Sequence, residues 1–392
     1  MMKTRRSAIL LGCTGSIGRT ALNGISQLKQ KEIIVKALSA HTQVLALAQA
    51  AKETGATAVC LTDPAGDIAT LKGLLPSTTT CYHGPQGLQD MLKDIDADIV
   101  LNGIVGAAGL PATLGALDTG HDVALANKES VVMAGQFLFD FAQVRGRRII
   151  PVDSEHSALY SLINAHGRNQ VETLVITASG GPFRTLPKEG FCEITVEQAI
   201  AHPTWKMGAK ISVDSATLAN KGLEVIEASY LFGFPASSIE VTVHPQSIVH
   251  SLVRLRNGAV YGQMSPSDMT LPIMEALSDG RLGLAKVVSP LDFSRLTLTF
   301  EQPDYDRFPL LRRAFACIRE QGSYCIAFNA ADEVAVQAFL SRRCSFTDIN
   351  EIVDRTLQQD WHKSAMDYPS VLEQDGLARR FATRALAEVS GK

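Results

Sequence analysis

The sequence predicts an α/β protein with a parallel sheet in its N-terminal part, an α+β segment in the middle and a small helical bundle at its C-terminus. Two observations predict the outer parts: short apolar runs alternate with helical stretches up to about residue 155, and the chain after Leu310 is almost entirely helical in pattern. Its 392 residues exceed what one hydrophobic core usually organises, so we expect more than one domain.

The apolar runs of the N-terminal part are typical of buried strands. They are Ala8–Leu11, Ile33–Leu38, Ala58–Leu61, Ile99–Leu101, Val123–Leu125 and Ile149–Val152. Such strands, separated by helices, indicate a parallel sheet that is covered on both faces. The stretch from Ile99 to Leu117 is uncharged and nominally long enough to span a bilayer, but its glycines and Pro111 break it into a strand, a turn and a helix start.

The middle part combines strands with a helix. We expect a strand at Thr173–Ala178, a helix at Thr217–Phe232 capped by Asp214 or Ser215, and extended runs at Ser247–Leu255 and Val260–Met264. Asn257-Gly258 separates the two extended runs and is the strongest short hairpin signal, so we expect antiparallel pairing there.

These patterns divide the chain into four segments. Residues 1–153 are expected to form the N-terminal domain, 154–280 the middle domain, 281–310 a linker and 311–392 the helical domain. The expected helices of the last domain are Leu311–Gln321, Ala330–Leu340, Asp348–Gln358 and Pro369–Val389.

Composition argues against several classes of protein. The chain is 46% hydrophobic and 20% charged, as in globular proteins, and its net charge of −3 without a basic block gives no support for a nucleic-acid partner. The seven cysteines are scattered, which argues against a disulfide framework and favours a reducing compartment, the cytoplasm. Residues 1–6 lead directly into the first expected strand, so we expect no signal peptide and no membrane partner.

A glycine-rich turn follows the first strand and opens a helix. Gly12-Cys13-Thr14-Gly15-Ser16-Ile17-Gly18 is a G-x-x-G-x-x-G variant of the dinucleotide fingerprint. Its glycines let the backbone approach a pyrophosphate at the helix N-terminus, where free N–H groups favour negative charge. The motif predicts a Rossmann-like domain with a cofactor site; the alternative is a plain glycine-rich turn.

The second strand is expected to end near Ala40-His41-Thr42-Gln43. NAD-dependent domains usually place an Asp or Glu at this point to bind the ribose 2′-hydroxyl. The absence of an acid favours NADPH, because an acid would repel its 2′-phosphate. The inference depends on the position of the strand end, which sequence patterns locate only to within a few residues.

Two carboxylates follow the last N-terminal strand. Asp153 and Glu155 are two residues apart, so in an extended segment both would project from the same face. Hard oxygen donors that converge in this way suit Mg²⁺ or Mn²⁺. Asp-x-Glu is also common on solvated surfaces, and that alternative stays open here.

A third carboxylate lies in the middle part. Asn220 and Glu224 are neighbours on one helix face, with Lys221 adjacent, and Ser215 is expected among the free N–H groups of the helix start. A lysine, an amide and hydroxyls near one helix terminus can form a phosphate cradle. The alternative for Lys221 and Glu224 is a surface ion pair.

Two loops of the middle part can also face a ligand. Ser179-Gly180-Gly181 forms a turn able to offer N–H groups to an anion, and residues 201–208 place His202, Trp205 and Met207 in a loop. Such a loop can be a lid that excludes water, or its apolar residues can pack in a core. His244 and His250 are expected to be structural.

Together these segments resemble the 1-deoxy-D-xylulose 5-phosphate reductoisomerase family. The matching motifs are GCTGSIG, LANKES (Leu125–Ser130), PVDSEHSAL (Pro151–Leu159), ASGGPF, HPTWKMGAKISVDSAT (His202–Thr217), NKGLEVIEA (Asn220–Ala228), VHPQSIVHS and SPSDMTLPI (Ser265–Ile273). They occur in family order within about the first 280 residues, whereas the C-terminal part fits by size and pattern only.

The resemblance implies a role for individual residues. The implied metal ligands are Asp153, Glu155 and Glu224, and the implied catalytic residues are Lys128, Glu155 and His202. The implied substrate contacts are Lys128, Ser154, Glu155, Ser179, His202, Trp205, Met207, Ser215, Asn220, Lys221 and Glu224, of which Ser179, Ser215, Asn220 and Lys221 surround the phosphate. The implied cofactor contacts are Gly12, Thr14, Gly15, Ser16, Ile17, His41, Thr42, Gln43, Asn127, Glu129 and Gly208.

The resemblance also implies the reaction. A member of this family converts 1-deoxy-D-xylulose 5-phosphate to 2-C-methyl-D-erythritol 4-phosphate with NADPH and Mg²⁺, Mn²⁺ or Co²⁺, in the non-mevalonate isoprenoid pathway, as a homodimer. The family often shows Gly-Lys-Asn where this chain has His41-Thr42-Gln43, so the usual lysine near the 2′-phosphate is missing, and Cys13 stands where Ser is common.

Two other functions compete with this one. A generic Rossmann oxidoreductase of the semialdehyde or homoserine dehydrogenase type would use a cysteine nucleophile or no required metal. An NADPH-sensing regulatory protein would have no reason to keep Asp153, Glu155 and Glu224 together. NADPH oxidation with and without metal separates all three.

Overall fold

The structure is a computed structural model that describes residues 5–28, 32–205, 207–281, 284 and 287–390. It divides into two compact units, each made of several stretches of chain. Unit 1 contains residues up to Ser130, Leu138–Ser157 and Asp268–Leu291, and unit 2 contains Val131–Phe137, Ala158–Ser267 and the chain from Asp292 onward. The domain boundaries that the sequence predicts, after residues 153, 280 and 310, stay a prediction.

Unit 1 is built on a sheet in which every neighbouring pair of strands is parallel. The strands are β1 (Arg6–Leu11), β2 (Ile33–Ala40), β3 (Ala58–Leu61), β4 (Thr80–His83), β5 (Ile99–Asn102), β6 (Asp122–Leu125) and β7 (Ile149–Pro151), in the order β4-β3-β2-β1-β5-β6-β7. The predicted parallel sheet is confirmed. Its strand β4 was missed, because β4 lies at the sheet edge and none of its residues is fully buried.

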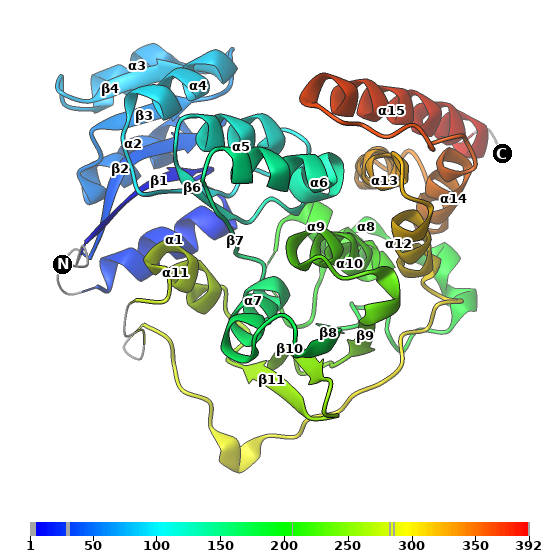
Figure 1. Cartoon of the computed structure of the whole chain (residues 1–392). Helices are drawn as coiled ribbons and strands as arrows, with labels where there is room; N and C mark the ends of the chain where they lie inside the picture. Colours follow the sequence, from blue (N-terminus) through cyan, green and yellow to red (C-terminus); the bar gives the residue numbers. More distant parts are fainter. Residues whose placement is uncertain (1–4, 29–31, 206, 282–283, 285–286, 391–392) are drawn as a thin grey trace. The chain divides into compact units, whose positions relative to one another are not determined.

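Helices connect the strands of unit 1 and pack against its sheet (Figure 1). They are α1 (Ser16–Ser26), α2 (Val44–Thr54), α3 (Ile68–Leu74), α4 (Gly84–Asp94), α5 (Gly109–Asp118) and α6 (Lys128–Val144). The apolar stretch from Ile99 is therefore a strand, a turn and a helix, as predicted. Among the residues that the structure describes, no helix is long and apolar enough to cross a membrane.

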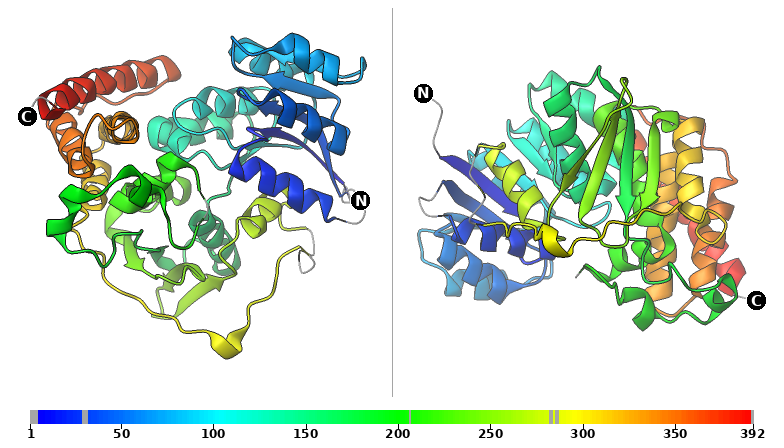
Figure 2. Two further views of the ribbon diagram at one scale, coloured as in Figure 1. Left: turned by 180° about the vertical axis from the view of Figure 1, so that it is seen from behind. Right: turned by 90° about the horizontal axis from the view of Figure 1, so that it is seen from below.

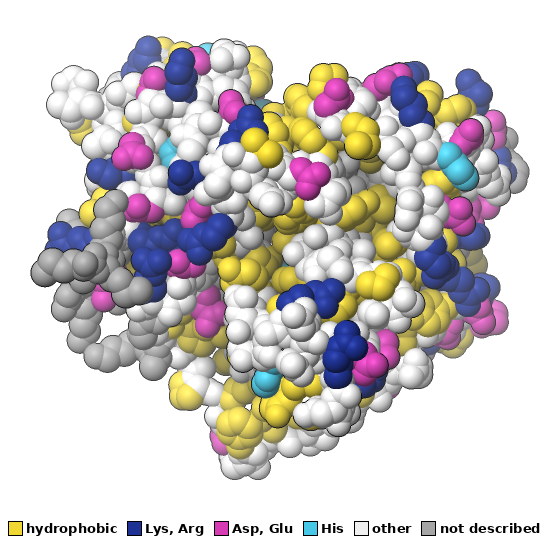
Figure 3. All heavy atoms as spheres, in the orientation of Figure 1, with side chains coloured by type: hydrophobic (Ala, Val, Ile, Leu, Met, Phe, Trp, Pro, Cys, Tyr) yellow, Lys and Arg dark blue, Asp and Glu magenta, His cyan; other side chains and the backbone are white. Residues whose placement is uncertain are grey.

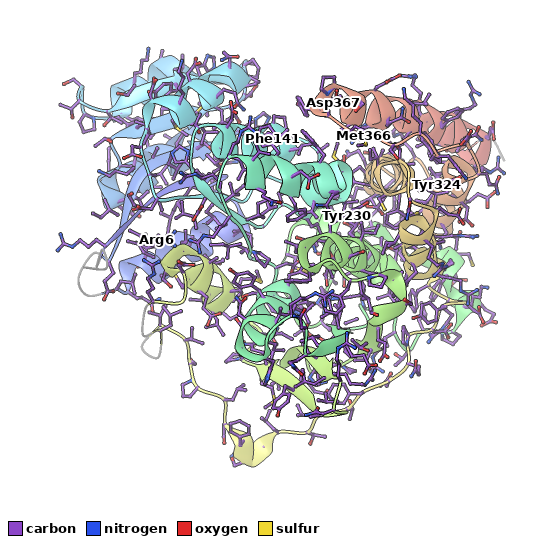
Figure 4. The ribbon with its side chains drawn as sticks, viewed as in Figure 1. Arg6, Phe141, Tyr230, Tyr324, Met366 and Asp367 are labelled. Carbon is purple, nitrogen blue, oxygen red and sulfur yellow. The ribbon has the colours of Figure 1, made fainter. Side chains whose placement is uncertain are left out.

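A segment distant in sequence completes unit 1. Helix α11 (Thr270–Ser278) packs against α1, where Gly24 leaves room for the side chain of Met274. Arg6, labelled in Figure 4, donates from Nη1 to the carbonyl of Leu277 at 3.0 Å, at the C-terminal end of α11. A cation is favourable there because the last carbonyls of a helix carry partial negative charge.

Unit 2 contains a second, mixed sheet in the order β11-β10-β8-β9 (Figure 2). Its strands are β8 (Val171–Ala178), β9 (Ile239–Val243), β10 (Val249–Leu255) and β11 (Val260–Met264). The predicted hairpin of β10 and β11 is confirmed. Strands β8 and β9 are parallel instead, because the helices α8 (Val196–Ile200), α9 (Ala209–Thr217) and α10 (Ala219–Phe232) form a crossover between them.

The C-terminal helices of unit 2 are those that the sequence predicts, with ends shifted by at most two residues, except that α13 begins at Tyr324 rather than at Ala330. They are α12 (Pro309–Glu320), α13 (Tyr324–Leu340), α14 (Phe346–Leu357) and α15 (Tyr368–Ser390). They share one apolar core with the second sheet, since Leu174 of β8, Ile226 of α10 and Phe328 of α13 belong to the same buried cluster. The segment before α12 contains a short 3-10 turn, η4 (Phe293–Arg295).

Candidate active site

The glycine-rich turn lies between β1 and α1, at the point where the strand order of the parallel sheet reverses. Gly12 has a φ of 73°, which favours glycine, and a Cβ atom at Gly18 would lie 2.5 Å from the carbonyl oxygen of Gly12. Gly15 occupies the N-cap position of α1 and has no side chain that could bond to the first amides of the helix. The amide groups at the start of α1 are therefore available to an anion, as the predicted pyrophosphate site requires.

The residues expected near the 2′-phosphate are exposed and lie between β2 and α2. Strand β2 ends at Ala40, so the predicted strand end is confirmed. The first turn of α2, which the structure describes completely, contains no acidic residue. Nδ1 of His41 lies 3.1 Å from Oγ1 of Thr62. The position therefore lacks the acid that NAD-dependent domains use.

Asn127 caps helix α6 from a buried position. Its side chain accepts the N–H of Ser130 at 3.0 Å and donates to the carbonyl oxygens of Ile104 and Gly106, at 2.8 and 2.9 Å. It also donates to Glu129 at 2.9 Å. The Asn127 side chain thus fixes the loop that follows β5 and the start of α6, so its backbone is better placed than its amide to contact a cofactor.

The carboxylates after β7 do not lie in one extended segment, so that prediction is wrong. Asp153 precedes α7 (Ser154–His166), and its carbonyl accepts the N–H of Ser157 at 2.8 Å, the first helical hydrogen bond. Glu155 lies in the first turn of the helix, so the alternation of a strand cannot bring the two carboxylates to one face. The proline of the PVDSEH motif ends β7, and the helix begins three residues after it.

Each of these carboxylates has a polar neighbour within unit 1. Nζ of Lys128, at the start of α6, lies 2.5 Å from Oδ2 of Asp153, and both side chains are largely buried. Oγ of Ser154 donates to Glu155 at 2.5 Å. The end of β7 therefore brings together Lys128, Asp153, Ser154 and Glu155, four of the residues implied by the resemblance.

In unit 2, Ser179 and His202 are in contact. Nε2 of His202 lies 3.0 Å from Oγ of Ser179, and Nδ1 accepts the backbone N–H groups of Thr204 and Trp205 at 3.1 and 2.9 Å. Because Nδ1 is an acceptor, the neutral ring carries its proton on Nε2 and donates it to Ser179. Burial lowers the pKa of His202, which favours this neutral form.

The loop between α8 and α9 is irregular, as predicted, and Lys206 lies outside the described residues. Trp205 and Met207 are half-buried. The Trp205 ring meets the His250 ring edge-on, with 6.3 Å between centroids. Trp205 is therefore neither a core residue nor a fully exposed one. As predicted, His250 and His244 are buried, and their rings lie within hydrogen-bonding distance of backbone carbonyls.

The predicted cap at Asp214 or Ser215 is wrong. Both residues lie inside α9, and Leu218, in the left-handed conformation with φ 58°, separates α9 from α10. Ser215 is thus in the last turn of one helix rather than among the free amides of the next. This one-residue interruption is not marked by a glycine or a proline, so the sequence pattern alone predicts one continuous helix.

Helix α10 presents the other implied phosphate residues. Nδ2 of Asn220 donates to Oε1 of Glu224 at 2.5 Å, and Nζ of Lys221 pairs with Oε2 of the same carboxylate. The predicted sharing of one helix face is confirmed. Lys221 and Glu224 are buried, with 4% and 1% of their surface exposed, so the surface ion pair is excluded.

The Ser179 turn and the end of α9 are in close contact. A Cβ atom at Gly181 would lie 2.6 Å from the carbonyl oxygen of Ser215. Gly181 also donates its N–H to Oγ of Ser179 at 3.2 Å. Unit 2 therefore brings Ser179, His202 and the segment of Ser215 together, although they come from three separate parts of the chain.

Some residues that shape the site were missed. Oγ of Ser39 accepts the N–H of Gly12 at 3.2 Å and so holds the glycine turn to β2. Gly109 is needed because a Cβ atom there would lie 2.4 Å from the Asn127 side chain. Neither residue belongs to a motif, and only the pairing of strands distant in sequence brings them to the site.

Comparison with known families gives a consistent match over almost the whole chain. A family described as 1-deoxy-D-xylulose 5-phosphate reductoisomerase matches residues 8–135, and its C-terminal domain matches 149–232. A family described as DXP reductoisomerase C-terminal domain matches residues 264–381. The C-terminal helical part, which the sequence motifs did not reach, is thereby included.

Similar proteins carry the same name. The 1-deoxy-D-xylulose 5-phosphate reductoisomerase of Treponema pallidum is 44% identical over 384 residues, 98% of each chain. The Zymomonas mobilis reductoisomerase in complex with NADPH superposes with a TM-score of 0.90 at 39% identity, over 97% of this chain and 99% of that one. A reductoisomerase with NADPH, fosmidomycin and magnesium gives 0.88 at 36% identity, over 97% and 98%.

Proposed function

This chain belongs to the 1-deoxy-D-xylulose 5-phosphate reductoisomerase family, and we propose that it converts 1-deoxy-D-xylulose 5-phosphate to 2-C-methyl-D-erythritol 4-phosphate in the non-mevalonate isoprenoid pathway. The enzyme is an NADPH-dependent oxidoreductase that also needs a divalent metal. The observation that carries the proposal lies in unit 1, where the glycine turn after β1 and the carboxylates after β7 occur at the same, C-terminal edge of one parallel sheet.

The carboxylates fit a magnesium- or manganese-type ion. Asp153, Glu155 and Glu224 supply hard oxygen donors, which these ions prefer, and we propose them as the ligands. When bound, the metal polarises the substrate carbonyl and the neighbouring hydroxyl and lowers the cost of negative charge on oxygen. Lys128 holds Asp153 in place, and Asn220 and Lys221 orient Glu224.

NADPH supplies the hydride for the reductive step. We propose that the pyrophosphate binds the turn of Gly12, Thr14, Gly15, Ser16 and Ile17, and that the 2′-phosphate faces the three residues between β2 and α2, His41, Thr42 and Gln43. Asn127, Glu129 and Gly208 complete the proposed contacts. The lysine that the family often uses is replaced here by Thr42, so neutral donors and amide groups take over part of its role.

The phosphate of the substrate is proposed to lie in unit 2. Ser179, Ser215, Asn220 and Lys221 offer hydroxyl, amide and ammonium donors from segments that contact one another. His202 donates through Nε2 toward Ser179 and so contributes a neutral donor rather than a charge. Ser154 adds a hydroxyl beside the metal ligand Glu155. Binding energy from a remote phosphate can be used for loop closure and rate.

The loop with Trp205 and Met207 is proposed to close over the bound ligands. Trp205 is half-buried and meets the His250 ring in a T-shaped arrangement, so part of the indole surface stays exposed and can cover a substrate. Met207 adds a flexible apolar side chain. Closure would exclude water while charge develops on the substrate oxygens.

We further propose that the enzyme is a cytoplasmic homodimer. Large apolar residues are exposed on the edge strand β11 and on the segment around η4: Val260, Tyr261, Met264, Phe293, Leu298 and Phe300. Apolar side chains gather over this lower part of unit 2 in Figure 3. A second copy that covers the patch and the strand edge would remove an aggregation hazard. The cysteines are free thiols, which supports a reducing compartment.

Product identity tests the proposal. The purified chain is incubated with 1-deoxy-D-xylulose 5-phosphate, NADPH and Mg²⁺, and the product is identified by NMR. We expect the branched 2-C-methyl-D-erythritol 4-phosphate in a one-to-one ratio with oxidised cofactor. A linear alditol phosphate as the product would mean that the enzyme reduces the substrate without rearranging it, and would contradict the proposal.

A further inference from the structure

We propose that Lys210 is a positioning residue for the substrate-phosphate site, which it serves by tying α9 to α13 through Asp214 and Asp332. The inference rests on the proposed function, because Ser215 of α9 is a proposed phosphate ligand. In this proposal Lys210 itself does not contact the substrate.

The three charged groups form a buried cluster in unit 2. Nζ of Lys210 lies 2.6 Å from Oδ2 of Asp214 and 3.1 Å from Oδ2 of Asp332. The exposed fractions of the three side chains are 18%, 3% and 0%. Asp332 is 122 residues away in the sequence, on a helix whose Ala331 and Val336 belong to the main core. The cluster therefore joins α9 to a rigid part of the unit.

The stability of α9 does not explain this arrangement. Lys210 lies near the N-terminus of the helix and Asp214 lies toward its C-terminus, so both charges oppose the helix dipole, and a basic residue preceding an acidic one is the weaker order for such pairs. Removing the charges from water costs free energy, and replacing buried ion pairs by apolar residues of similar volume often leaves a protein equally stable or more stable. Burial also raises the pKa of Asp332, and only the nearby Lys210 ammonium and neighbouring hydrogen bonds oppose that shift.

The geometry of α9 gives the cluster a function. The helix begins directly after Gly208, at the end of the proposed closing loop, and includes Ser215 in its last turn. The carbonyl of Ser215 packs against Gly181 of the Ser179 turn. A shift of α9 would therefore move a phosphate ligand and one end of the loop together. Misplacement by about 1 Å can reduce the rate by about 100-fold.

The test compares Lys210→Met with a matched control. Arg379→Met removes a cation of α15 that pairs with Glu333 of α13 and with Asp375 of its own helix, and so also joins α13 to a second helix, but outside the proposed site. We expect Lys210→Met to raise KM for 1-deoxy-D-xylulose 5-phosphate at least about tenfold, with KM for NADPH unchanged. Arg379→Met should change neither KM. Lys210→Arg keeps a cation at the position and should raise KM for the substrate less than Lys210→Met does.

The role of Asp332 is tested by a double-mutant cycle. Asp332→Leu should raise KM for the substrate as Lys210→Met does, and the double variant should be no worse than either single one, because both remove the same tie. If the effects on KM add, or if both variants lower only the melting temperature while KM stays at the wild-type value, the positioning role is overturned.

A second readout keeps the inference separate from the proposed function. Hydrogen exchange of α9 amides should become faster in Lys210→Met, whereas α14 should keep its wild-type protection. Unchanged exchange in α9 would overturn the tie. If the wild type does not turn over 1-deoxy-D-xylulose 5-phosphate, the proposed function fails. Faster exchange in α9 of Lys210→Met would then still show that the Lys210 cluster holds α9, but its role in substrate binding would be overturned.

Discussion

Nδ1 of His202 accepts the backbone N–H of Trp205 at 2.9 Å, so one ring nitrogen sets the start of the loop while the other faces Ser179. The two contacts can be separated by mutation. His202→Asn places a carbonyl near the position of Nδ1, and His202→Gln places an amide near that of Nε2. We expect both variants to lower kcat/KM, but only His202→Gln should make residues 201–208 more sensitive to limited proteolysis. Equal proteolysis of both variants would contradict this assignment of the ring nitrogens.

Acid should weaken the His202 contacts. Because its folded pKa is lowered from 6.5, the stability that depends on neutral His202 is present above about 6.5 and is lost as the pH falls through the folded pKa. Protonated Nδ1 can no longer accept from Thr204 and Trp205. We expect an acidic limb of the kcat/KM profile with a pKa below 6.5 that His202→Gln lacks. An unchanged limb in the variant would assign it to another group.

The proposed metal ligands can be tested with a near-isosteric change. Glu155→Gln replaces an anionic ligand by a neutral one. It should lower activity by at least about 100-fold, the upper end of the losses caused by mutating groups that only support the ligands of a metal. Folding and NADPH affinity should stay at wild-type values. Near-normal turnover of the variant at limiting Mn²⁺ would refute the assignment of Glu155.

Cofactor choice depends on the exposed residues after β2. Without an acid at residues 40–43, NADPH should exceed NADH in kcat/KM by more than about tenfold, which corresponds to about 1.4 kcal/mol. Thr42→Lys, which restores the residue often found in the family, should increase this ratio, and Thr42→Asp should reverse it. Equal use of the two cofactors by the wild type would show that the strand-end argument fails.

Loop closure is tested by fluorescence. The chain has two tryptophans, and Trp361 is fully buried among the C-terminal helices, so a Trp361→Phe background leaves Trp205 as the reporter. We expect its emission to change when NADPH, metal and a phosphonate mimic of the substrate are all present. Trp205→Ala should lower kcat/KM and leave metal affinity unchanged. Emission that does not respond to the ligands would show that Trp205 only packs on His250.

Sequence patterns predicted the fold where local signals are strong. The parallel strands, the Asn257-Gly258 hairpin and the four C-terminal helices are confirmed, because each depends on apolar periodicity or turn chemistry within a short window. Strand β4 was missed because an edge strand needs no continuous apolar run.

The site was less accessible to sequence reasoning. The carboxylates were assigned to an extended segment, whereas Glu155 lies in the first turn of a helix. Ser215 was assigned to a helix start, whereas it lies in the last turn of α9. Neither boundary is marked by a glycine, so the break at Leu218 is set by tertiary packing rather than by local propensity. The pairing of Lys210 with Asp332 joins residues far apart in the sequence, and no local pattern can predict it.

The central claim is that one enzyme joins nicotinamide reduction to metal-dependent rearrangement. Its most direct test is the rate of NADPH oxidation with 1-deoxy-D-xylulose 5-phosphate, measured after removal of metal by a chelator and again after addition of excess Mg²⁺ or Mn²⁺. We predict that oxidation stops without metal and returns when the metal is restored, while NADPH still binds in both conditions. Oxidation at the full rate without metal would contradict the account.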